Sequence, residues 1–172
     1  IVEDIVPAGN KKTRNKVITR EFVQKTGKPF NKFLVRRSVE RVYNLGFFDD
    51  VNVRMLPGEK DPNNVIIEID VLEHKTGTIT LGAGYSKSDG LMGIVEFGED
   101  NLRGTGDKFK VHWEIGGKKK YKNYQISYLK PWIDHRGTSL GFSFFNREDE
   151  YTDYDSDGSE VAEYNKKSKG FN

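Results

Sequence analysis

The sequence predicts an α+β unit with the element order β-α-α-β-β, followed by an antiparallel up-and-down β-meander that forms the N-terminal, incomplete part of a transmembrane β-barrel. Apolar residues recur at helical spacing only before residue 75, whereas after Gly77 apolar and polar residues alternate with a period of two. The 18 glycines and the aromatic content of 12% favour short, twisted strands over a helix bundle. We therefore expect one domain over residues 1–74 and a second over residues 75–172.

Two helices are predicted in the first unit. The first begins at Thr13 or Asn15, either of which could cap it, and Gly27 ends it. Asn31 is a suitable N-cap for the second helix, which carries valines at positions i, i+4 and i+7. This second helix ends at Gly46, which stands where a glycine with positive φ is favoured.

Three strands complete the first unit. The apolar run over residues 1–6 indicates an edge strand. Strands over 51–56 and 65–72 follow the helices, and the turn over 57–64, which contains proline and glycine, joins them as a hairpin. The predicted unit is a three-stranded sheet covered on one face by two helices.

Five strands of alternating pattern follow, each near the roughly 9–11 residues that a tilted membrane strand needs. A soluble sheet packed on a core would show the same alternation, but no second apolar layer is encoded after Gly77 to cover such a face. The pattern therefore favours membrane strands. Their apolar positions are Ile79, Leu81, Ala83 and Tyr85; Leu91, Val95 and Phe97; Phe109, Val111, Trp113 and Ile115; Tyr124, Ile126 and Tyr128; and Leu140, Phe142 and Phe144.

Charge and residue types argue against several classes of function. Lys and Arg number 28 against 26 Asp and Glu, and a net charge of +2 argues against a nucleic-acid partner. The absence of cysteine removes thiol catalysis and cysteine-ligated metals. None of His74, His112 and His135 lies at metal-ligand spacing to another histidine, and no phosphate-loop or nucleophile motif is present. We expect no enzyme activity, no metal site and no cofactor.

An acidic stretch over residues 148–165 is predicted to be a solvated extracellular loop. Residues 153–158 match the opening of an EF-hand calcium loop, but Tyr164 occupies the twelfth position, where a glutamate would bind the ion. Five strands, or six if another begins at Ser168, cannot close a barrel of eight or more strands. We therefore expect an incomplete barrel.

Several motifs resemble known families. Residues 45–51 (LGFFDDV) and 19–22 (TREF) resemble the POTRA (polypeptide-transport-associated) domain. The segments 82–86 (GAGYS), 100–106 (DNLRGTG) and 128–132 (YLKPW) occur in the order seen at the start of BamA-like outer-membrane barrels. Each motif alone is weak, whereas their order and spacing together are specific. The chain thus resembles the last POTRA domain and the first barrel strands of a BamA-like outer-membrane β-barrel assembly factor.

The resemblance implies a function in the bacterial outer membrane, with the POTRA domain in the periplasm. Its implied partners are unfolded outer-membrane proteins, here called clients, together with accessory outer-membrane lipoproteins and the lipid bilayer. Clients would add a strand to the free edge of the POTRA sheet by β-augmentation. That expected edge is Val51, Asn52, Val53, Arg54, Met55 and Leu56.

The first barrel strand would then act as a lateral gate at which clients fold and insert, since glycines weaken a strand. The expected gate strand is Gly77, Thr78, Ile79, Thr80, Leu81, Gly82, Ala83, Gly84 and Tyr85. Arg20 and Glu21, on the first helix, resemble a docking surface for the lipoproteins, although solvated helix charges would look the same. Two alternatives stay open: a two-partner secretion or translocation pore of the same superfamily, and a soluble POTRA-like protein-binding module.

Overall fold

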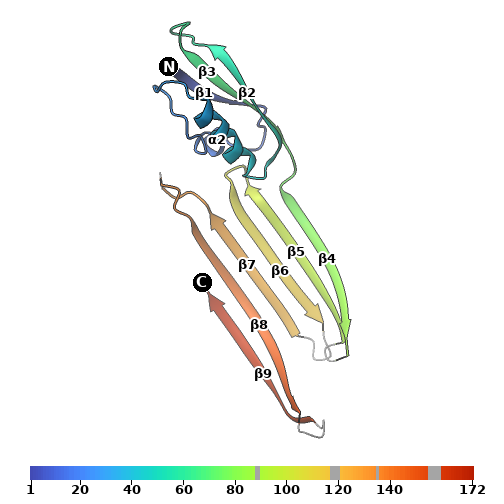
Figure 1. Cartoon of the computed structure of the whole chain (residues 1–172). Coiled ribbons are helices and arrows are strands. Elements are labelled where there is room, and N and C mark those ends of the chain that lie inside the picture. Colours follow the sequence, from blue (N-terminus) through green and yellow to red (C-terminus); the bar gives the residue numbers. More distant parts are fainter. Residues whose placement is uncertain (88–89, 117–120, 135, 155–159) are drawn as a thin grey trace. The chain divides into compact units, whose positions relative to one another are not determined.

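A computed structural model describes residues 1–87, 90–116, 121–134, 136–154 and 160–172 (Figure 1). The chain forms two compact units. The first contains Ile1–Thr76 and Asp100–Asp107, and the second contains Gly77–Glu99 and Lys108–Asn172. Each unit is described by itself below.

The first unit has the predicted order β-α-α-β-β. Its sheet has the strand order β1-β3-β2, with β1 parallel and β2 antiparallel to the central strand β3. Helix α1 contacts β1 and helix α2 contacts β2, so that the helices cover one face of the sheet (Figure 1). The elements are β1 (Val2–Ala8), α1 (Asn15–Thr19), α2 (Lys32–Tyr43), β2 (Phe48–Pro57) and β3 (Val65–Glu73).

The core of this unit lies between the helices and the sheet. Alternate residues of β3 point into it, and Ile67 and Ile69 are fully buried. Phe22 and Phe47 fill the space between the sheet and the helices, each with 2% of its surface exposed. Burial of each such side chain contributes about 1.5–3 kcal/mol to stability.

The N-terminus of α2 forms as predicted, whereas the helix ends at Tyr43 with Asn44 as its C-cap, slightly before the predicted end at Gly46. Asn31 accepts hydrogen bonds through its side-chain oxygen from the backbone N–H groups of Phe33, at 2.9 Å, and Leu34, at 3.3 Å. Beyond the helix, Gly46 has a φ of 72°, which a residue with a side chain adopts only at a cost.

The first helix is shorter than predicted, because α1 ends at Thr19 and not near Gly27. The N–H groups of Glu21 and Phe22 bond three residues back, as in a tight turn. The next two N–H groups, of Val23 and Gln24, donate to the hydroxyl of Ser38 on α2, at 2.9 and 3.3 Å. The Ser38 hydroxyl on α2 thus takes the place of the backbone carbonyls to which these two N–H groups would donate if α1 continued.

The second unit is a six-stranded antiparallel sheet in which the strands lie side by side in chain order (Figure 1). Strands β4 and β9 form its two edges, and the sheet is not closed. Within the described part of the chain, no helix is both long and apolar enough to cross a membrane. The strands are β4 (Gly77–Ser86), β5 (Gly90–Leu102), β6 (Asp107–Gly116), β7 (Tyr121–Lys130), β8 (Leu140–Tyr154) and β9 (Glu160–Phe171).

The predicted acidic loop over 148–165 is wrong for its described residues, since β8 continues to Tyr154 and β9 begins at Glu160. The sixth strand therefore starts well before Ser168. One opposite-charge pair crosses the two strands: Lys167 of β9 lies opposite Glu148 of β8, with Nζ and Oε1 3.0 Å apart. Opposite charges across neighbouring strands stabilise their pairing.

Candidate functional site

Strand β2 lies at an edge of the POTRA-like sheet, where its backbone pairs with β3 on one side. Phe48 and Val51 are buried at its start, with 3% and 8% of their surface exposed. Toward its end Met55 is 60% and Leu56 41% exposed, so that apolar side chains flank the edge backbone. All six residues predicted to receive a client strand lie on this edge.

The other edge of this sheet, at β1, is occupied where the strand begins. The N–H of Val2 donates to the carbonyl of Lys28 at 2.9 Å, and Gly27 N–H donates to the Val2 carbonyl at 2.8 Å. In the part of the chain that the structure describes, no such backbone bond reaches residues 49–56 of β2 from outside the sheet. The two edges therefore differ, and β2 is the more accessible one.

Arg54 lies in the middle of β2 and makes two ion pairs across the sheet. Its Nη2 is 2.7 Å from Oε1 of Glu68 and 3.3 Å from Oδ2 of Asp70, both on β3. The side chain is 61% exposed, and such exposed pairs contribute about 0–1 kcal/mol. Its charge is thus directed over β3 and away from the edge backbone.

Strand β4 is an edge of the second sheet and carries the predicted gate residues. Ile79, Leu81 and Tyr85 are each more than 70% exposed on one face. A Cβ added at Gly84 would meet no described atom within 4 Å, and at Gly82 it would meet only the Cβ of Ile94, at 3.7 Å. The described residues therefore leave room for side chains at both glycines.

One face of the six-stranded sheet is apolar over β4–β7 and the start of β8, whereas Glu148 of β8 and Lys167 of β9 pair on the same face farther along these two strands. Aromatic rings of neighbouring strands pack on this face: Phe97 and Phe109 with centroids 6.4 Å apart, and Tyr128 and Phe142 with centroids 5.3 Å apart. An apolar groove of about 590 Å³ also opens on this face. Its lining residues are Phe109, Ile126, Tyr128, Phe142, Phe144 and Phe171.

The opposite face of the same sheet is mostly polar. Glu96 of β5 and His112 of β6 approach to 3.4 Å, and Asn123 of β7 donates to Glu114 of β6 at 3.4 Å. A sheet with one apolar and one polar face, whose apolar side chains are exposed, matches the alternation of a membrane barrel with a polar interior.

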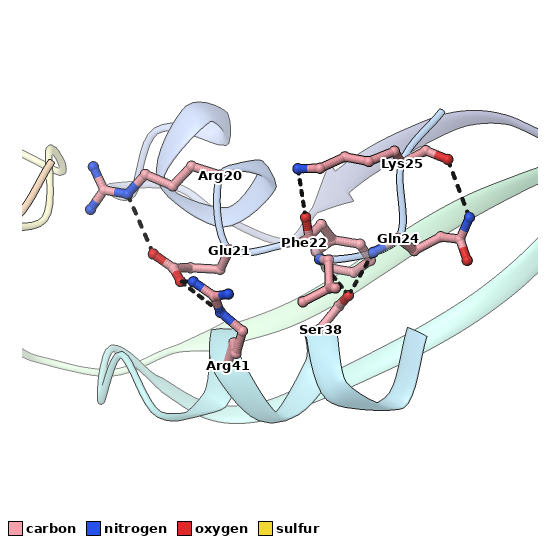
Figure 2. A network of polar contacts seen from close by, with 8 residues as sticks. Arg20, Glu21, Phe22, Gln24, Lys25, Ser38 and Arg41 are labelled. Atoms are coloured by element: carbon pink, nitrogen blue, oxygen red, sulfur yellow. Dashed lines mark hydrogen bonds and ion pairs between the residues drawn. The ribbon is translucent and has the colours of Figure 1, made fainter. Parts of the chain in front are cut away.

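Arg20 and Glu21 form an ion pair (Figure 2), and their side chains are 14% and 9% exposed, so that they do not lie on a solvated helix face. Glu21 follows α1, is 7% exposed and accepts two hydrogen bonds from Arg41 of α2, at 2.9 and 3.2 Å. Burial lowers the pKa of Arg20, and the carboxylates of Glu21 and Asp107 oppose that shift. The prediction of solvated helix charges is wrong, and the pair connects the segment after α1 to α2.

Glu73, at the end of β3, has a role that sequence reasoning missed. Its carboxylate accepts the backbone N–H groups of Lys11, Lys12 and Thr13 at 2.8, 2.8 and 2.7 Å. Burial alone would raise the pKa of Glu73, but the Thr13 hydroxyl and these three N–H groups donate to the charged form and lower it. No sequence pattern marked this site, since its partners lie some sixty residues upstream.

Metal binding finds no support among the described residues, where no group of three or more His, Cys, Asp or Glu could hold an ion. The calcium-like segment begins with Asp153 and Tyr154 in β8, and its continuation over 155–158 lies outside the described residues.

Family profiles match both parts of the chain. The POTRA profile, described as a surface antigen variable number repeat, matches residues 1–74, and the Omp85 superfamily domain matches residues 101–172. Among curated proteins, the outer membrane protein assembly factor BamA of Neisseria meningitidis serogroup B is 32% identical over 146 residues, which are 85% of this chain and 18% of that protein. BamA of Neorickettsia risticii is 33% identical over 138 residues, 80% of this chain and 18% of that protein.

Solved structures agree with these matches. BamA from Haemophilus ducreyi lacking POTRA domains 1–3 superposes with a TM-score of 0.75 and 26% identity, over 87% of this chain and 28% of that one. CdiB from Acinetobacter baumannii has a TM-score of 0.61 at 18% identity, over 95% of this chain and 31% of that one, which shows a shared fold alone. The chain spans less than a fifth of the length of the two curated relatives. The two domains and the BamA relatives place the chain in the outer membrane, with its POTRA domain in the periplasm, and it belongs to the Omp85 family as a BamA-like protein.

Proposed function

We propose that this chain is the membrane-proximal part of an outer-membrane protein assembly factor, which binds unfolded clients at the β2 edge and promotes their insertion at β4. The observation that carries the proposal is the accessible β2 edge in a POTRA domain that directly precedes Omp85 barrel strands. The names of the two BamA relatives support the same activity.

Client binding at β2 would follow the chemistry of β-augmentation. An extended client segment pairs its backbone N–H and C=O groups with those of the edge, which needs no particular client sequence. Alternate side chains of the client then lie beside Met55 or Leu56, whose exposed apolar surfaces suit the alternating pattern of an outer-membrane strand. This edge would thus favour barrel strands over polar chains while staying tolerant of their sequence.

Insertion at β4 would use the same backbone chemistry inside the membrane. Gly82 and Gly84 lower the strand stability of β4, and glycines in a strand allow another backbone to approach closely. Glycines can also relieve crowding inside a curved barrel, but the described residues leave open space around both positions, which does not support that role. We therefore assign β4 as the strand on which a client strand forms.

Two further possibilities, a secretion pore and docking of lipoproteins on Arg20 and Glu21, have less support. A secretion pore of the CdiB kind rests on fold likeness at 18% identity, so assembly is the better supported function. Docking of accessory lipoproteins directly on Arg20 and Glu21 is disfavoured by burial, since their side chains are only 14% and 9% exposed. We propose that this pair supports a docking surface only indirectly, by fixing the position of α2.

Site-specific photo-crosslinking tests client binding at β2. A photoreactive amino acid replaces Met55 or, as the matched control, Leu72, which is 61% exposed but lies on the central strand β3. In the full-length protein, we expect an unfolded outer-membrane client to crosslink several-fold more strongly at position 55 than at position 72. Equal yields at the two positions would show that exposure alone governs contact and would contradict binding at the edge.

A further inference from the structure

We infer that the β5–β6 turn with its flanking strand ends, Asp100–Asp107, is a folded part of the POTRA domain and that Asn101 is the residue that holds it there. The family profile ends at residue 74, whereas the contacts of the first unit include this later segment. The inference is independent of the proposed function, because it concerns what completes the domain and not what the domain binds.

The nitrogen and the oxygen of the Asn101 side-chain amide both form hydrogen bonds within the first unit. It is 1% exposed, its Nδ2 donates to Oγ1 of Thr13 at 2.8 Å, and its Oδ1 accepts the N–H of Gly106 at 2.9 Å. Thr13, 3% exposed, in turn donates its hydroxyl to the carboxylate of Glu73. A continuous hydrogen-bonded chain therefore runs from β3 through the loop before α1 to the turn.

The backbone of the turn fits the same loop closely. The carbonyl of Gly104 accepts the N–H of Arg14 at 2.9 Å. Gly104 has a φ of +73°, and a Cβ there would collide with the carbonyl oxygen of Lys12. At Gly106, also in a positive φ conformation, a Cβ would lie 2.6 Å from Nη2 of Arg20. Gly104 thus permits an approach of two backbones that a side chain would block, whereas at Gly106 the close atom is the end of the Arg20 side chain.

Because Asn101 and Thr13 are both buried, the hydrogen bond between their side chains should affect the stability of the loop over residues 11–14. A buried polar group that loses its partner is destabilised by its full desolvation penalty. Removal of the Asn101 amide would leave the buried Thr13 oxygen and the Gly106 N–H without that partner. The loop over residues 11–14 would then keep its bonds to Glu73 and the backbone bond from Arg14 to Gly104, but it would lose the side-chain bond from Thr13 to Asn101.

Hydrogen–deuterium exchange on the full chain in detergent micelles tests the inference. In Asn101→Ala we expect amide exchange to accelerate roughly tenfold to a hundredfold in both the turn and residues 11–14. The matched control is Asp134→Ala in the β7–β8 turn, where Asp134 accepts the N–H groups of Arg136 and Thr138 at 2.9 Å each. This control should accelerate exchange only around residues 134–138.

A reciprocal variant keeps the test decisive if Asn101→Ala does not fold. Thr13→Val preserves side-chain size but removes the hydroxyl, and we expect faster exchange at Gly106 although this residue lies far along the chain. Acceleration confined to the mutated segment in each variant would overturn the inference, since the turn and the loop would then be stable independently. Acceleration in both segments in either variant would support it.

Discussion

Glu21 accepts two hydrogen bonds from the guanidinium of Arg41, at 3.2 Å from Nε and 2.9 Å from Nη2, and thereby joins the segment after α1 to α2 (Figure 2). Removal of the carboxylate in Glu21→Ala leaves a partly buried guanidinium without this partner. We expect a loss of roughly 1–3 kcal/mol in the free energy of unfolding of the POTRA domain, measured by hydrogen exchange of its core amides.

The matched control for this pair is Glu40→Ala. Glu40 pairs with Arg36 at 3.1 Å, but the two side chains are 57% and 80% exposed. Such an exposed helical pair contributes about 0.3–0.5 kcal/mol. Equal losses in the two variants would show that the burial of Glu21 has no energetic consequence.

The carboxylate of Glu73 predicts a pH dependence of the loop over residues 11–13. The pKa of Glu73 is lowered in the folded protein, so its stabilisation is fully present above the ordinary glutamate pKa and is lost as the pH falls through the lowered value. We expect NMR signals of the Lys11, Lys12 and Thr13 amides to shift together below pH 4.5, the ordinary value for the group.

Glu73→Gln removes the charge while it keeps one acceptor oxygen. At pH 7 this variant should lose about 1–3 kcal/mol of local stability, and the difference from the unmodified protein should vanish at low pH, where the carboxylate is protonated. A difference that stays constant from pH 7 to pH 3 would attribute the effect to packing and not to charge.

Gly104 and Gly27 form a matched pair, because both have a φ of +73°. A Cβ at Gly27 would meet nothing within 4 Å, so Gly27→Ala should cost roughly 1–2 kcal/mol for the backbone conformation alone. Gly104→Ala adds the collision with Lys12, and we expect a loss of roughly 3 kcal/mol or more. The free energy of unfolding is measured by thermal unfolding. Similar decreases in the two variants would mean that the β5–β6 turn can move away from Lys12 with little loss of stability.

Alanine substitutions test the gate strand in the full-length protein. Gly82→Ala and Gly84→Ala each stabilise a strand by roughly 0.5–1 kcal/mol, and both sites have room for the methyl group. We expect client insertion to slow several-fold in the double variant. Gly93→Ala on the neighbouring β5, where a Cβ has only ordinary contacts at 3.8 Å, is the control and should assemble clients normally. A double variant that no longer folds, judged by heat-modifiable migration, would favour the crowding role instead.

Arg54 permits a separate test of the edge backbone. Arg54→Pro removes an N–H and two ion pairs, whereas Arg54→Ala removes only the ion pairs. We expect client affinity to fall at least several-fold in the proline variant and to stay nearly unchanged in the alanine variant. Hydrogen exchange in β3 would show whether the sheet is intact. Unchanged affinity in the proline variant would count against β-augmentation at this edge.

Local patterns predicted most of the elements. The period of two in β4–β8, the cap at Asn31 and the glycine at Gly46 each depend on neighbouring residues, and each appears as expected. The end of α1 could not be predicted in this way, because the competing acceptor is Ser38 on another helix. The strand over 160–171 could not be predicted from the pattern, since its residues do not alternate between apolar and polar and it pairs with β8 through the backbone ladder.

The same distinction between features set by neighbouring residues and features set by distant ones applies to the candidate site. The β2 edge was expected from the resemblance to POTRA domains, and the strand order β1-β3-β2 places β2 at an edge. The burial of Glu21 and the role of Asn101 depend on residues 20 and 88 positions away, for which one sequence offers no pattern. Their polar character instead suggested exposed surface.

The contact between Asn101 and Thr13 also sets an order of events in folding. The 88 residues that separate the pair form a loop whose closure is entropically unfavourable until the intervening strands are compact. Local contacts of the helices and of the β2–β3 hairpin form before contacts of such long range. We therefore expect the contact between Asn101 and Thr13 to form after the local contacts of the POTRA domain, so that its formation would report on the ordering of the chain between the two residues.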